Sequence, residues 1–118
     1  MSYIIKSGKN NSIIFNIIKK LDRESFENFE EDILNSIKKQ YSCYIFCFEN
    51  MEYLASRVIG VMIKLRKSID EDIPIYLVSP SLYIIKILDI LNIRDFFHIV
   101  DSIDGVYEKK NNLSWHQN

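Results

Sequence analysis

The chain has 118 residues, of which 47% are hydrophobic and 26% are charged, and its formal net charge is −1. This length and composition are typical of one globular domain with a single core. The near-neutral charge gives no basic field that would indicate direct nucleic-acid binding. No apolar run is long enough to cross a bilayer and no secretory signal is visible, so we expect a cytoplasmic protein without membrane insertion.

The first elements predict an antiparallel hairpin at one edge of a sheet. Two segments rich in β-branched and aromatic residues, Tyr3 to Ser7 and Ser12 to Ile18, flank the residues Gly8 to Asn11, which favour a turn.

The next segment predicts a helix that Asp22 or Ser25 caps and that ends near Lys39. Its apolar residues recur at helical spacing and predict a core face of Phe26, Phe29, Ile33, Leu34 and Ile37. Acidic residues crowd this helix, whereas the second helix carries Arg57, Lys64, Arg66 and Lys67. This asymmetry either steers a partner of mixed charge or only solvates two helix faces.

Cys43 to Phe48 is continuously apolar, which predicts a central strand with both faces covered. Cys43 and Cys47 share a face of this strand at a separation of about 13 Å, which is too far for a disulfide between them. We expect both to be buried thiols. His98 and His116 stand alone, so the sequence indicates no metal site and no cofactor.

A loop beginning at Met51 leads into a second helix, which ends near Ile69. The spacing turns one stripe toward the sheet: Val58, Val61, Met62, Leu65 and Ile69. Ile59 and Ile63 lie beside that stripe and are either exposed apolar contacts or part of a wider buried face. Ser56 falls at or near the start of this helix, where its hydroxyl either caps the helix or is presented to a modifying enzyme.

The remaining chain continues the alternation of strands and helices. Ile75 to Val78 predicts a buried strand, and Ser79-Pro80-Ser81 starts a third helix that ends near Leu91, with an apolar face of Ile84, Ile85, Ile87, Leu88 and Leu91. Phe97 to Val100 predicts a last strand, and Ile103 to Lys110 a fourth helix. We expect one domain over residues 1–110 and a polar tail over 111–118 that is loose or docked only through Trp115.

This alternation predicts an α/β fold with a mixed sheet, in which right-handed parallel crossovers follow the N-terminal antiparallel hairpin and about four helices are present. No phosphate-binding loop can be written, because Gly8, Gly60 and Gly105 are isolated. No nucleophile with a His and an acidic partner is evident either. We therefore expect a binding protein and not an enzyme.

Several short motifs follow one another along the chain: Leu21-Asp22 after the second strand, the loop Tyr53 to Gly60, the strand end Val78-Ser79-Pro80, the helix Leu88 to Leu91 with Asn92-Ile93, Phe97 and Ile99, and then Ser102 and Val106. Taken in this order they resemble the STAS domain, the fold of bacterial anti-sigma factor antagonists, over roughly Tyr3 to Lys110. The family pattern begins with Leu-Asp and continues with an aromatic-apolar-Asp-Ser-Ser-Gly-apolar-Gly loop, a strand ending in Ser-Pro, and a helix followed by Phe-x-Ile.

The resemblance implies a protein that docks on an anti-sigma factor of the ATPase type, which is also a serine kinase. It places the phosphorylated serine at Ser56. The docking surface around it would comprise Ala55, Arg57, Ile59, Gly60, Ile63 and Lys64, and the protein would be a monomer or weak dimer.

The chain departs from the family motif at three positions. Ala55 replaces the acidic residue, Arg57 the second small hydroxyl residue and Val58 the glycine. Three readings therefore stay open: an antagonist switched at Ser56, a constitutive STAS scaffold in a signalling assembly or lipid-transport complex, and a small-ligand or nucleotide-binding domain.

Overall fold

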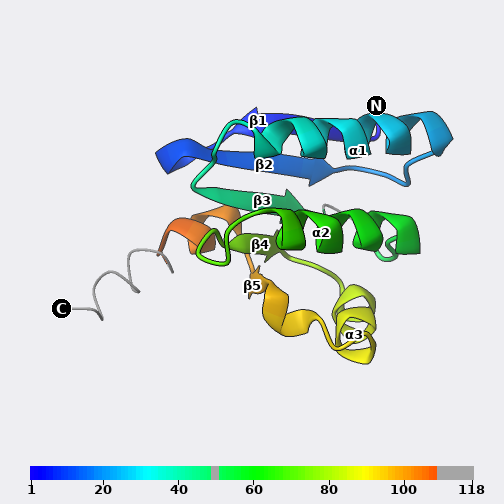
Figure 1. The fold of residues 1–118 in the computed structure, drawn as a ribbon. Helices are drawn as coiled ribbons and strands as arrows, with labels where there is room; N and C mark the ends of the chain where they lie inside the picture. Colours follow the sequence, from blue (N-terminus) through cyan, green and yellow to red (C-terminus); the bar gives the residue numbers. More distant parts are fainter. Residues whose placement is uncertain (49–50, 109–118) are drawn as a thin grey trace.

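A computed structural model describes residues 1–48 and 51–108 of the chain. Along the sequence it contains β1 (Tyr3–Ser7), β2 (Ser12–Ile17), α1 (Arg23–Ile37), β3 (Cys43–Cys47), α2 (Ser56–Ser68), β4 (Ile75–Val78), α3 (Leu82–Ile90) and β5 (His98–Val100) (Figure 1). Short 3-10 turns occupy Lys9–Asn11 and Arg94–Phe96, and residues 103–108 are helical.

The described strands form one mixed sheet in which spatial order equals sequence order, β1-β2-β3-β4-β5. β1 and β2 are antiparallel, and each later strand is parallel to the one before it. The predicted mixed α/β fold with an N-terminal hairpin is therefore confirmed.

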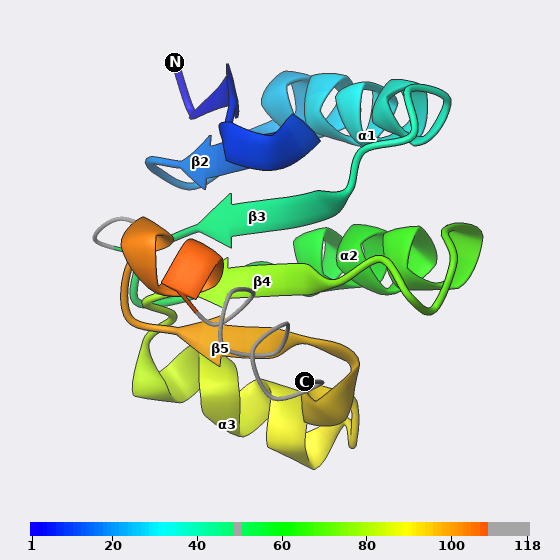
Figure 2. The ribbon, with the colours of Figure 1, turned by 90° about the vertical axis from the view of Figure 1, so that its left-hand side faces the viewer.

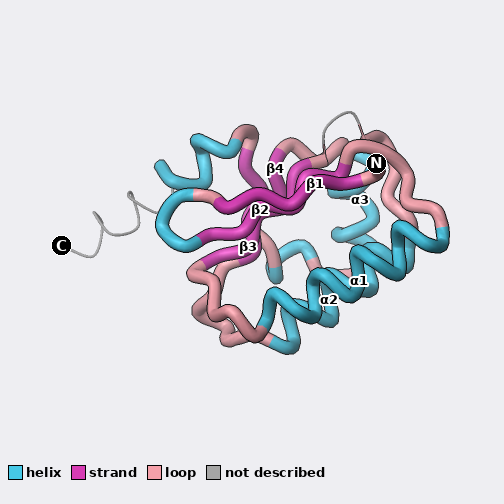
Figure 3. The backbone as a smooth tube through the Cα atoms, turned by 90° about the horizontal axis from the view of Figure 1, so that it is seen from above, coloured by secondary structure: helices cyan, strands magenta, loops and turns pink. Residues whose placement is uncertain are grey.

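Helices cover both faces of the sheet, but unequally. α1, α2 and α3 contribute to the larger apolar core on one face, and α1 and α2 lie side by side along it (Figure 1, Figure 3). The segment 103–108 lies on the opposite face, over the ends of the middle strands (Figure 2), where Val106 joins a second, smaller cluster.

β3 is the centre of the molecule and is buried along its whole length, as its continuous apolar sequence predicts. On the helical face Phe46 stacks on Phe15 of β2 at 5.3 Å between ring centroids, and Phe29 of α1 meets Phe15 edge-on. Cys43 and Cys47 are buried thiols that share the smaller cluster, so the prediction of buried thiols is also confirmed.

The start of α1 follows one of the two predicted alternatives. Asp22 is the N-cap, and its carboxylate accepts a hydrogen bond from the Ser25 N–H at 2.8 Å. Hydrogen bonds from the backbone and from the side chain of Ser25 lower the pKa of the Asp22 carboxyl, and Lys19 and Arg57 add smaller effects in the same direction.

Two predicted core residues are exposed. Leu34 was expected on the buried face of α1, but 45% of its surface is accessible, because it follows the fully buried Ile33 and is rotated about 100° away from it. Leu91 is 50% accessible, because α3 ends at Ile90 and Leu91 is only its C-cap.

The segment 103–108 is fastened to the hairpin at the other end of the sequence. The Tyr107 hydroxyl accepts a hydrogen bond from the Lys9 N–H at 2.9 Å and lies 3.0 Å from Ser12 Oγ. Gly8 fits closely beneath this contact, since a Cβ there would lie 2.2 Å from Ser12 Oγ and 2.6 Å from the Tyr107 hydroxyl.

Several predictions fall outside the described residues: the last two residues of the fourth helix, Lys109 and Lys110, and the tail 111–118 with Trp115 and His116. No helix in the described part of the chain combines the length and apolar character needed to cross a bilayer.

Candidate functional site

The candidate site is built at the carboxyl end of the parallel strands, where the loop after β3 enters α2. Ala55 is the N-cap of α2, with extended backbone angles (φ −63°, ψ 143°). Its carbonyl accepts hydrogen bonds from the N–H groups of Val58 and Ile59, at 3.0 and 3.2 Å.

Ser56 is the first residue inside α2 and not its cap, so the helix-cap alternative for its hydroxyl is wrong. No side chain caps this helix, because the cap position holds an alanine. The Ser56 side chain is exposed.

The exposed residues of α2 form one stripe that starts at Ser56. Gly60 and Lys64 follow at intervals of four residues, so they lie along the same side of the helix. Nothing lies within 4 Å of the position that a Cβ on Gly60 would take. The stripe is therefore open enough for another chain to approach closely.

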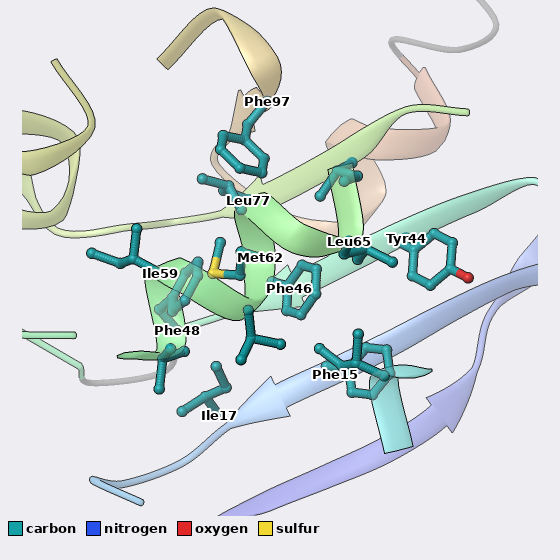
Figure 4. Close-up of a cluster of buried hydrophobic side chains, with 14 of the residues drawn as sticks. Phe15, Ile17, Tyr44, Phe46, Phe48, Ile59, Met62, Leu65, Leu77 and Phe97 are labelled. Carbon is teal, nitrogen blue, oxygen red and sulfur yellow. The ribbon is translucent and has the colours of Figure 1, made fainter. Parts of the chain in front are cut away.

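Two of the predicted contact residues do not belong to this stripe. Ile59 is only 4% accessible and packs in the core beside Met62 and Phe48, as Figure 4 shows. Ile63 is half-buried and packs against the same core. Ile59 is therefore not an exposed apolar contact, as one of the two predicted alternatives had it. The buried face of α2 is wide enough to include Ile59 beside the stripe that was predicted to face the sheet.

Arg57 links the start of α2 to the connection between β2 and α1. Its guanidinium donates a hydrogen bond to the Leu21 carbonyl at 3.1 Å and lies 4.6 Å from the centroid of the Phe26 ring. A small hydroxyl residue, as in the family motif, has no side chain that reaches either partner. The replacement of this hydroxyl residue by Arg57 therefore adds a contact between α2 and the start of α1.

The loop before α2 is also held from the side of α3. Ser81, the N-cap of α3, accepts a hydrogen bond from the Ile84 N–H and donates one to the Glu52 carbonyl at 2.6 Å. The Tyr53 ring meets Tyr83 edge-on at 4.7 Å, although 59% of the Tyr53 surface remains accessible.

Two cavities flank this loop. One, of about 630 Å³, lies at the carboxyl ends of β2, β3 and β4 and is lined by Asn16, Cys47, Phe48, Met51, Glu52, Val78, Ser79, Ser81 and Ile103. The other, of about 540 Å³, lies between the β2–α1 connection and the start of α2 and is lined by Lys20, Leu21, Met51, Glu52, Tyr53, Leu54, Ala55 and Val58.

The chemistry offered at this end of the sheet is that of binding and of modification at a hydroxyl. Ser56 presents an oxygen that does not serve the helix, and α2 carries only basic charged residues. No group of three or more potential metal ligands occurs within residues 1–48 and 51–108.

Ser56, Gly60 and Lys64, which were predicted for the phosphorylation site and the docking surface, lie on the exposed stripe. The hydrogen bonds that fix the loop were not predicted. The sequence predicted only that Ser81 lies at the start of a helix. Its hydrogen bond to the Glu52 carbonyl joins residues that are 29 positions apart in the sequence. The contact from Arg57 to Leu21 joins residues that are 36 positions apart. No local pattern in the sequence indicates such pairs, because their members lie far apart along the chain.

Comparisons with known proteins agree with this architecture. The family model described as "STAS domain" matches residues 3–106. No curated protein matches the sequence. Among solved structures, a putative anti-sigma factor antagonist from Thermotoga maritima is 23% identical with a TM-score of 0.77, covering 91% of this chain and 92% of its own. SpoIIAA of Bacillus in its phosphorylated form is 13% identical with a TM-score of 0.74, covering 90% and 97%.

Proposed function

The chain belongs to the STAS domain family, and from this premise we propose that it is a regulatory protein that acts by binding an anti-sigma factor of the serine-kinase ATPase type in the cytoplasm. The observation that carries the proposal is the placement of Ser56 as the exposed first residue of α2, at the head of the open stripe that continues through Gly60 and Lys64. The docking surface is this stripe with Ala55 and Arg57.

Phosphorylation of Ser56 would switch the docking. A phosphate adds about −1.5 to −2 charges at neutral pH. The first turn of a helix tolerates negative charge, because its free N–H groups and its dipole favour an anion there. The modification therefore acts on the partner, by charge and obstruction, and leaves the fold intact.

A constitutive scaffold is the second candidate, and Arg57 is the observation that favours it. Its guanidinium is engaged with Leu21 and Phe26, and Val58 is buried in the core. The departures from the family motif at Arg57 and Val58 thus both contribute to the fold of this chain. In such a scaffold the same surface binds its partner without regulation at Ser56.

The test is to incubate the purified protein with the serine-kinase anti-sigma factor encoded in the same genome and ATP, and to map phosphate by mass spectrometry. We expect one phosphate on Ser56, none on the Ser56→Ala variant, and at least a tenfold weaker complex with Ser56→Asp. A complex without phosphate, unchanged in Ser56→Asp, would favour the scaffold. No complex at all would overturn the proposed function.

A further inference from the structure

The cavity between the β2–α1 connection and the start of α2 has walls that are held in place before any partner arrives. Leu21 and Val58 form its base and are almost completely buried. Arg57 fixes one wall through its hydrogen bond to the Leu21 carbonyl. Ser81 fixes the other through the Glu52 carbonyl. A pocket held in this way loses little conformational entropy on being filled.

The lining of this cavity is mostly apolar. Leu21, Leu54, Ala55 and Val58 supply aliphatic surface, and Met51 adds a thioether. Binding energy at protein interfaces concentrates where one large apolar or aromatic side chain fills such a pocket near the centre of the contact. At about 540 Å³ the cavity can admit one aromatic side chain.

Along α2, the surface that leads away from the cavity is basic. Lys20 contributes to its lining, and Lys64 and Lys67 are exposed farther along α2. α2 contains no acidic residue, and among the described residues that line the cavity Glu52 alone carries a carboxylate. A partner segment with carboxylates beside its apolar anchor would complement this charge.

We propose that this cavity receives an apolar anchor side chain, of the size of Leu or Phe, from an acidic segment of the anti-sigma factor. That segment lies along Ser56, Gly60 and Lys64, and the inference rests on the proposed function. The acidic character of that segment also explains how a switch at Ser56 would work. A phosphate at the head of the stripe would face carboxylates at the moment of docking, and like charges held close together oppose association.

The cavity is tested by Ala55→Trp, which places a large ring at the cavity mouth from an exposed position outside the core. The matched control is Asn35→Trp, because Asn35 is exposed on α1 and takes no part in the cavity. With the anti-sigma factor kinase as the probe, calorimetry should show at least tenfold weaker binding for Ala55→Trp and unchanged binding for Asn35→Trp. Thermal unfolding checks that both variants are folded.

The charge is tested by Lys64→Glu against Lys86→Glu, an exposed position on α3 outside the stripe. We expect several-fold weaker binding only for Lys64→Glu, and wild-type affinity that falls as salt is raised. If wild type binds and folded Ala55→Trp binds equally well, the anchor pocket is overturned while the proposed function stands. Equal binding by the two charge variants overturns the acidic partner segment. If wild type fails to bind, the proposed function fails, and this inference falls with it.

Discussion

The Arg57 guanidinium donates a hydrogen bond to the Leu21 carbonyl while lying over the Phe26 ring, so one side chain joins the start of α2 to the start of α1. An exposed cation–π contact contributes about 0.5–1 kcal/mol, and a hydrogen bond contributes a similar amount.

Arg57→Ala should therefore lower the free energy of unfolding by about 1–2 kcal/mol in urea titrations. Lys64→Ala is the control on the same helix, where a surface substitution should change stability by less than about 0.5 kcal/mol. Equal effects of the two substitutions would show that the Arg57 contact contributes nothing to the fold.

The uncapped start of α2 can be improved. Replacing Ala55 by Asp should raise the free energy of unfolding by about 1 kcal/mol, because a carboxylate at the N-cap accepts hydrogen bonds from the first turn. Ser56→Ala should leave stability almost unchanged, since Ser56 lies inside the helix. If Ser56→Ala instead lowered the free energy of unfolding by about 1 kcal/mol, the Ser56 hydroxyl would be the cap of α2 after all.

Two glycines should respond oppositely to the same substitution. Gly8→Ala forces a methyl group against Ser12 and Tyr107 and should cost about 1–3 kcal/mol. Gly60→Ala has open space and should stabilise by about 0.5–1 kcal/mol, because alanine favours the helix. Chemical denaturation of both variants provides the measurement, and effects of the same sign would contradict the described surroundings of Gly8 or Gly60.

The Gly60→Ala variant also serves as a probe of docking. A stabilised protein whose affinity for the anti-sigma factor falls would place the partner's backbone against this position. Unchanged affinity would move the contact away from Gly60 and toward the ends of the stripe.

Acid should destabilise the protein partly through Asp22. Its pKa is lower in the folded state than in the unfolded chain, so its contribution is present above the unfolded value, near 4, and is lost as the pH falls through the folded value. Asp22→Asn keeps a capping oxygen but does not titrate there. The unfolding midpoint of Asp22→Asn should fall less between pH 5 and 2 than that of wild type, and parallel curves would exclude this role for Asp22.

The sequence predicted the order and nature of the strands and main helices, because each strand is short and apolar and each helix shows a regular apolar stripe. It was less accurate at the edges of these stripes. Leu34 and Ile59 are both apolar neighbours of buried positions, yet Leu34 is exposed and Ile59 is buried. The width of the buried face of a helix depends on which elements pack against it, and the apolar periodicity of the helix alone does not show this.

The candidate site was predicted only in part, because its contacts also depend on elements that are distant in the sequence. Ser56 was placed within one residue of the helix start, but the cap fell on Ala55, a residue with no capping group. The role of Arg57 depends on Leu21 and Phe26, which are far away in sequence and become neighbours only when α1 and α2 pack together.

The arrangement of the sheet has a consequence for synthesis on the ribosome. Because spatial order equals sequence order among the described strands, each strand after β1 can add to the edge of the strand made just before it. The face that carries Cys43 and Cys47 differs, because Val106 and Tyr107, which pack on it, follow all the described strands in the sequence. A nascent chain therefore completes these strands before that face is closed, and the bond from Lys9 to Tyr107 is made only after β5 has been synthesised.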